Sequence, residues 1–317
     1  MEKFKQSLKE STAFYSLIGL VVLIILSSII APNFRTVKNM ITIFRQASLL
    51  LILSSGLTAV LLTGTMDLSV GATAGLVGCV VAQLIKSSVS VPVAALIGVL
   101  IGVIIGLING TLAGILPGFI ATYGTNWVIA GLGIAIMRGQ VIYDLPQSFT
   151  WFGTGYIGPI PVLVIFALIV VAILYVLLTK TTLGRRIYQY GSNPVAAEYA
   201  AVPTRRIVLS AFVICSICAA FAGMLMTARL NAADAAMGDT YGLQTVAAAV
   251  IGGTSQKGGE GGVLGTIAGA LILTIVVNVM NLTGIPAQAQ GLVIGAVIII
   301  MVLIDTVTRK RQENKID

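Results

Sequence analysis

The chain has 317 residues, of which 57% are hydrophobic and only 9% charged, and its mean hydropathy is +1.02. Because about a quarter of the residues in a soluble domain are charged, this composition excludes an ordinary soluble protein. The net charge of +8 does not indicate nucleic-acid binding, since Lys and Arg fall at the ends of apolar runs, where they set orientation in a membrane.

Ten apolar segments follow one another along the chain, and they predict an all-α integral membrane protein with about ten transmembrane helices in one domain, 1–317. Three lysines precede the first segment, but it is of span length and lacks a small-residue cleavage site, so we expect it to be retained as a helix. The segments lie at about 13–31, 46–64, 68–86, 92–114, 117–137, 159–179, 207–228, 243–253, 263–283 and 285–305.

Two of these positions indicate broken helices at membrane depth. The turn TGTMDLSVG at 63–71 is too short to leave the membrane, and the segment 243–253 is only about half a bilayer long. Irregular backbone survives at that depth only where protein or a water-filled cavity surrounds it, so both breaks hint at a transport pathway. Asp67 lies in the first break. It either caps the helix expected from Leu68 or holds a coupling ion, and the sequence favours the cap.

Glycine recurs at every fourth position in the fourth segment, which favours close helix packing. Residues four apart advance about 40° around a helix, so the first members of this stripe share one face. Small residues at that spacing let helices approach closely in lipid, and the alternative is an interface that moves. The residues assigned to helix packing are Gly98, Gly102, Gly106, Gly110 and Gly114.

Side chains for catalysis or metal binding are scarce. The sequence has no histidine, which excludes HExxH and Ser-His-Asp sites, and it has no GxxxxGK[ST] loop for ATP. Cys215 and Cys218 form a CxxC without a second pair, so we expect neither a metal site nor a cofactor. The GxGxxG at 153–158 has no preceding strand and is read as a chance match. A membrane-embedded enzyme is therefore disfavoured.

One long basic loop, at about 180–206, contains a short helix. Asn193 is a good N-cap, Pro194 suits the first helical position and Pro203 stops the helix. Val195, Tyr199 and Val202 recur at i, i+4 and i+7 and predict a small apolar face, rimmed by arginines, that binds lipid or a protein groove. The small alanines around it favour a protein. The predicted contact residues are Asn193, Pro194, Val195, Ala196, Ala197, Glu198, Tyr199, Ala200, Ala201 and Val202.

Amide side chains are the main polar groups inside the apolar segments. Amides exchange hydrogen bonds with hydroxyl groups without holding a fixed charge, which suits a pathway for a polyhydroxylated neutral solute. The alternative, bonding between helices, weighs equally at this stage. The candidate pathway residues are Asn109, Asn126, Asn278 and Asn281.

The distribution of basic residues predicts the orientation. With ten crossings and both termini in the cytoplasm, 13 of the 19 Lys and Arg residues face the cytoplasm. This assignment places both the loop at 180–206 and the C-terminal tail, 306–317, in the cytoplasm. The six residues on the other side are Arg35, Lys38, Arg45, Lys86, Arg138 and Arg229.

The sequence resembles the ribose-type sugar permeases of bacterial ABC importers over roughly 30–305. The resemblance is carried by TGTMDLSVG at 63–71, by GRRIYQYGSNPVAAEYAAV in the basic loop, and by ARL at 228–230 with AVIGGTSQKGGEGGVLGTIAGALIL at 249–273. It implies that the loop helix is a coupling helix that docks into a separate cytoplasmic ATPase. Ala201 stands where these permeases usually have glycine, so we expect the helix to continue slightly further here.

The resemblance further implies a multi-pass protein of the bacterial inner membrane that pairs with a second permease chain, identical or not. Its other expected partners are ATPase subunits that hydrolyse the ATP, an extracytoplasmic sugar-binding protein and membrane lipid; no nucleic acid is expected. The main alternative is a self-contained secondary carrier in which Asp67 holds the coupling ion. Vesicle uptake separates the two, because one needs ATP and partners and the other only an ion gradient.

Overall fold

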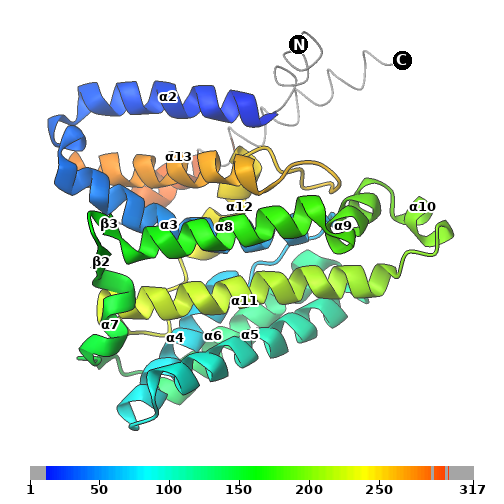
Figure 1. Cartoon of the computed structure of the whole chain (residues 1–317), viewed down its shortest axis with the longest axis horizontal. Helices are drawn as coiled ribbons and strands as arrows, with labels where there is room; N and C mark the ends of the chain where they lie inside the picture. Colours follow the sequence, from blue (N-terminus) through cyan, green and yellow to red (C-terminus); the bar gives the residue numbers. More distant parts are fainter. Residues whose placement is uncertain (1–11, 287–288, 297–298, 300–317) are drawn as a thin grey trace.

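The computed structural model describes residues 12–286, 289–296 and 299, which form a bundle of helices (Figure 1). The longer helices are α2 (Thr12–Ile30), α3 (Val37–Leu61), α4 (Val70–Lys86), α5 (Val91–Ala113), α6 (Gly118–Met137), α8 (Val162–Lys180), α11 (Thr204–Leu230) and α13 (Val263–Leu282). The shorter ones are η1 (Pro32–Arg35), α7 (Gln147–Thr154), α9 (Thr182–Ser192), α10 (Pro194–Tyr199) and α12 (Tyr241–Ile251). The all-α prediction is confirmed.

Four two-residue strands form two small antiparallel pairs. Strand β1 (Ile142–Tyr143) pairs with β4 (Ala232–Ala233), and β2 (Tyr156–Ile157) pairs with β3 (Ile160–Pro161). The GxGxxG at 153–158 thus runs from the end of α7 into a hairpin, with Gly158 in the left-handed conformation at the turn. It does not join a strand to a helix, so the dinucleotide-binding interpretation is excluded.

Among the described residues, six helices are long and apolar enough to cross a membrane, namely α3, α5, α6, α8, α11 and α13. Three further predicted segments coincide with the shorter apolar helices Ser16–Ile30 (within α2), α4 and α12. Part of the tenth segment, 285–305, lies outside the described residues, as do the first eleven residues and the tail. The figure of about ten spans and the cytoplasmic position of both termini stay predictions.

Helix α11 lies at the centre of the bundle, packed against α5, α3 and α4 (Figure 1). Helix α2 covers α13 at one edge, and α6 packs on α4 at the other. The approach of α3 to α11 is close, because a Cβ at Gly56 would lie 2.6 Å from the Cβ of Cys218. All three cysteines, Cys79, Cys215 and Cys218, are buried and unpaired.

The glycine stripe of α5 faces α11. A Cβ at Gly102 would lie 2.8 Å from the carbonyl oxygen of Ser216, and one at Gly106 would lie 2.6 Å from the Cα of Val213. Gly110 contacts the α11 backbone in the same way. Gly98 instead meets side chains, those of Val77 and Val81 on α4 and Met224 on α11, and Gly114 has only carbonyls of its own helix nearby. Three of the five glycines assigned to packing therefore lie where the two backbones nearly touch, and Gly98 packs against side chains.

Helices α4 and α12 both begin inside the bundle, after an irregular segment. At 1.5 Å per residue α12 is only about 16 Å long, roughly half the apolar thickness of a bilayer. Irregular segments, 62–69 and 234–240, precede them, and the first turn of α4 meets the second segment where Gly71 and Gly238 contact each other through backbone atoms. The expectation of two irregular breaks at 63–71 and near 243 agrees with these segments.

The bundle has two structurally different ends (Figure 1). Helix α7 and the β2–β3 hairpin lie at one end, and α9 and α10 lie at the other. Helix α11 connects them, since it contacts α9 and α10 near its start and α7 and β4 near its end. Helices α9 and α10 together, called the docking loop for the role that the sequence predicts, therefore lie a full helix length away from α7.

Candidate functional site

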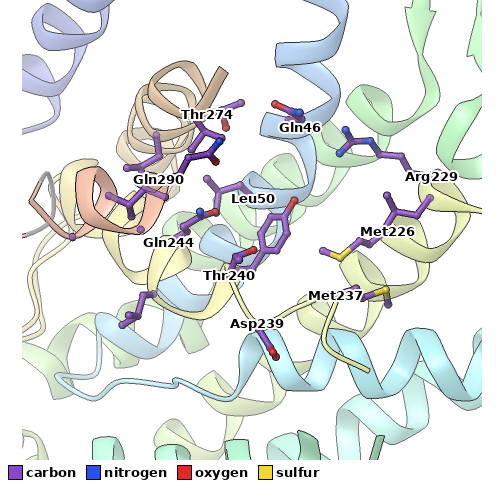
Figure 2. A pocket seen from close by; sticks show the side chains of 18 residues that line it. Gln46, Leu50, Met226, Arg229, Met237, Asp239, Thr240, Gln244, Thr274 and Gln290 are labelled. Carbon is purple, nitrogen blue, oxygen red and sulfur yellow. The ribbon is translucent and has the colours of Figure 1, made fainter. Parts of the chain in front are cut away.

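A cavity of about 650 Å³ opens beside α11 toward the α7 end of the bundle. Figure 2 shows Gln46 and Arg229 on one side of it and Gln244, Thr274 and Gln290 on the other. Helices α3, α11, α12 and α13, the segment before α12 and the helical residues 289–296 all contribute to its wall. The cavity thus lies where the broken helix α12 begins.

The local sequence explains why polar groups collect at this position. Arg229 lies in the last turn of α11, after which Asn231 takes the left-handed conformation and turns the chain into β4. The chain then returns through Asp239 and Thr240 to start α12 inside the bundle, which brings Gln244 onto the first turn of a short helix. A full-length span would have carried these residues to the membrane surface.

The lining combines hydroxyl and amide groups with apolar side chains and with two charged residues, Arg229 and Asp239. Amides and hydroxyls both donate and accept hydrogen bonds, so they can match the alternating donors and acceptors of a polyhydroxylated solute. Leu50, Met226 and Met237 supply apolar contact between them. The volume is in the range of small-molecule sites. The cavity can therefore hold a neutral, hydroxyl-rich molecule.

None of the four predicted amides lines this cavity. Asn278 and Asn39 exchange two hydrogen bonds, of 3.0 and 2.8 Å, between α13 and α3. Asn281 accepts a 2.7 Å bond from Gln290 and so supports one lining residue from behind. Asn126 is half-buried on α6, a helix that contributes nothing to the lining.

The fourth amide, Asn109, belongs to a buried group with Asp67. Its Nδ2 donates to Ser69 Oγ at 2.7 Å, and Ser69 donates through both its Oγ and its backbone N–H to Asp67 Oδ1, at 2.7 and 2.8 Å. Helix α4 begins at Val70, two residues later than expected, and Asp67 binds the N–H just before it. These contacts are those of a carboxylate that organises the chain entering α4.

The glutamines Gln46, Gln244 and Gln290 were missed by the sequence analysis. Each lies in or at the edge of a predicted apolar segment, so a search for all amides would have included them. Their convergence could not be read from the sequence, because they come from three separate parts of the chain.

Both helices of the docking loop begin at a residue whose side chain caps them. Thr181 accepts from the backbone N–H of Gly184 and Asn193 from that of Ala196, so α9 and α10 each start on a capped residue. Helix α10 has six residues, with Tyr199 89% and Val195 63% exposed. The arginines at 185, 186, 205 and 206 are also exposed. The loop therefore presents an uncovered apolar face with a basic rim.

Two details of α10 differ from the sequence prediction. The expectation that it runs on past Ala200 was wrong, because it ends at Tyr199 and Ala201 takes the left-handed conformation, with φ of 56°. An alanine thus adopts the conformation that glycine would adopt more readily. Val202 lies beyond the helix and is partly buried against the core, and Ala197 is buried, so neither belongs to the exposed face.

Comparison with known proteins places the chain among permeases. Residues 39–302 match the family described as the permease component of the branched-chain amino acid transport system. The chain is 39% identical to the ribose import permease protein of Bacillus subtilis (strain 168), covering 91% of each chain. It is 35% identical to the ribose import permease protein of Escherichia coli (strain K12), covering 92% of each.

A relative that is named for a different sugar is similar to the same extent. The D-allose transport system permease protein of Escherichia coli (strain K12) is 36% identical, over 92% of this chain and 90% of its own. No solved structure matches.

Proposed function

We propose that this chain forms the sugar pathway of an ABC importer. The chain belongs to the family of the branched-chain amino acid transport permease component and, within it, to the ribose-type sugar permeases. It is a multi-pass protein of the inner membrane. In this proposal two permease chains form the pathway, two ATPase subunits bind from the cytoplasm, and a binding protein delivers a pentose or hexose from the other side. ATP hydrolysis belongs to the ATPase subunits.

The observation that carries this proposal is the placement of the cavity and the docking loop at opposite ends of α11. The polar cavity lies toward α7, on the side that the basic residues assign to the outside. The exposed face of α10 lies on the other side, where a cytoplasmic ATPase would bind. A solute site facing one compartment and a docking surface facing the other is the arrangement that an importer driven by a separate ATPase needs.

The side chains that line the cavity are suited both to binding a sugar and to releasing it again. Its uncharged polar groups, among them Gln46, Gln244, Gln290 and Thr274, bind hydroxyls without the strong attraction of an ion pair. We infer that selection of the sugar is made mainly by the binding protein and that the cavity passes related sugars. Similar relatives are named for different sugars, ribose and D-allose, which supports this inference.

The alternative of an ion-coupled carrier predicts a different outcome for Asp67. In the importer, Asp67→Asn keeps an oxygen that accepts from Ser69 and removes the ionisable carboxyl group. We expect proteoliposomes containing the variant, the ATPase and the binding protein to retain at least about half of the ATP-driven uptake of radiolabelled D-ribose or D-allose. Proton or sodium gradients without ATP should drive none.

Uptake that follows an ion gradient and disappears in correctly inserted Asp67→Asn protein would favour the carrier. The matched control is Asp144→Asn, which removes the same group from an exposed loop residue at the α7 end.

The cavity itself is tested by Gln244→Leu, which keeps the approximate volume and removes the amide. If the solute binds this wall, the variant should lower uptake about 5- to 20-fold, as expected from the loss of one to two hydrogen bonds. Gln83→Leu, on the exposed side of α4 and away from both the cavity lining and the docking loop, is the matched control and should transport normally. Equal uptake by Gln244→Leu and Gln83→Leu would place the pathway elsewhere.

A further inference from the structure

The docking loop contacts the helices of the cavity through a dense backbone junction on the α9 side of the bundle. We define the glycine junction as Gly64, Gly191, Gly258 and Gly259. These residues come from three distant segments, namely the end of α3, the last turn of α9 and the loop 252–262 that joins α12 to α13. In the sequence this loop is part of the motif at 249–273, and the proposed function assigns it no task.

The contacts in the glycine junction are between backbones. The N–H of Gly259 donates to the carbonyl oxygen of Leu62 at 2.9 Å. A Cβ at Gly191 would overlap the same carbonyl oxygen, and a Cβ at Gly258 would lie 2.7 Å from the nitrogen of Gly64 and 2.9 Å from the carbonyl oxygen of Gly191. Gly64, Gly258 and Gly259 all have positive φ, of 74°, 91° and 73°, which other residues adopt only with strain.

One side-chain hydrogen bond also joins α9 to the loop 252–262. The hydroxyl of Tyr188, on α9, donates to the carbonyl oxygen of Gly261 at 2.9 Å. Burial raises the pKa of Tyr188 above its usual value near 10, so this hydroxyl stays protonated and able to donate at physiological pH. Ser192 contacts Gly259, and a single residue, Asn193, separates it from α10.

The segments that meet here continue directly into the cavity wall. The loop 252–262 leads back into α12, which carries Gln244, and forward into α13, which carries Thr274. Helix α3, whose end accepts from Gly259, carries Gln46. Because no long side chains lie between the backbones of the glycine junction, little rotamer freedom is available there to absorb a displacement of α9.

We propose that Tyr188 and the glycine junction are the positioning link through which movement of the docking loop reaches α12 and α13 and so changes the cavity. The proposal rests on the proposed function and adds to it the residues that transmit the movement. They contact neither the sugar nor the ATPase face of α10. Their loss should therefore separate ATP hydrolysis from transport while leaving docking intact.

The test measures the number of sugar molecules imported per ATP hydrolysed. The permease is reconstituted in liposomes with its ATPase and binding protein, and uptake of radiolabelled D-ribose or D-allose is divided by phosphate release. Tyr188→Phe removes only the hydroxyl that binds Gly261, and we expect the ratio to fall about fivefold, the low end of typical coupling between sites. ATPase co-purification and the rate of hydrolysis should stay at the unmodified level.

Tyr190→Phe is the matched control, because it lies two residues away on α9 and its hydroxyl has no hydrogen bond within the part of the chain that the structure describes. Gly191→Ala is the stronger variant and should lower the ratio further, with Gly124→Ala, on an open face of α6, as its control. If Gly191→Ala does not insert correctly, Tyr188→Phe alone decides.

Two results would overturn the link. One is an unchanged ratio in correctly inserted Tyr188→Phe, and the other is loss of ATPase co-purification in that variant, which would mean that Tyr188 only shapes the docking surface. Failure of the proposed function looks different. In that case the unmodified permease captures no ATPase or imports neither sugar with ATP, before any variant is compared.

Discussion

Replacing Tyr199 with aspartate should release the ATPase from the permease. Tyr199 is 89% exposed at the end of α10 and is the largest side chain on the exposed face. Aromatic anchors of this kind contribute roughly 2 kcal/mol or more to an interface, which is about a 30-fold loss of affinity. The substituted carboxylate adds an unpaired charge to the groove that the ring would fill. Co-purification of the ATPase and hydrolysis stimulated by loaded binding protein should fall together.

The permease itself should be unaffected by Tyr199→Asp, because nothing in the described bundle packs over that ring. Tyr143→Asp is the control, since Tyr143 is also exposed but lies in β1, at the opposite end of the molecule. Undiminished capture of a fully responsive ATPase by Tyr199→Asp would show that α10 is not the docking element.

Gly106→Leu should prevent correct assembly of the bundle. Its Cβ alone would lie 2.6 Å from the Cα of Val213 and 2.9 Å from the carbonyl oxygen of Phe212, so α5 and α11 would have to separate. Overpacking costs about 1–3 kcal/mol where side chains can adjust, and we expect a larger loss here because the obstacle is backbone. The measurement is the fraction of purified protein that stays monodisperse after heating in detergent.

The matched control for Gly106→Leu is Gly124→Leu, where an added Cβ would meet nothing within 4 Å among the described residues. The control should assemble and transport like the unmodified chain. If both variants melt at the same temperature, the stripe is not a packing contact and the explanation of its spacing fails.

Local sequence signals identified helices better than they identified contacts. The cap-and-proline pattern at Asn193 and Pro194 correctly located the start of α10, because both signals act within a few residues. Helix α3 begins at Val37 rather than near 46, since Thr36 caps it and Asn39 is buried against Asn278. A polar start of that kind looks like a loop until its partner on α13 is known.

The composition of the cavity wall depends on tertiary structure more than the positions of the helices do. The breaks at 63–71 and 243–253 could be predicted because a bilayer sets the length that a spanning helix needs. Which polar side chains gather beside them depends on how α3, α12 and α13 meet, and no local pattern encodes this. The asparagines were predicted to line the pathway because they are polar residues in apolar segments, but one of them, Asn278, forms a hydrogen-bonded pair between two helices.

The burial of all three thiols among the packed helices has a consequence for redox chemistry. An inner-membrane protein faces a reducing cytoplasm on one side and an oxidising compartment on the other, and exposed cysteines on the outer side can form unwanted disulfides. Oxidation requires access to the thiolate, and Cys79, Cys215 and Cys218 are all covered by neighbouring helices. The three thiols are therefore shielded from oxidants in either compartment, and the CxxC of α11 serves as small buried side chains packed against α3.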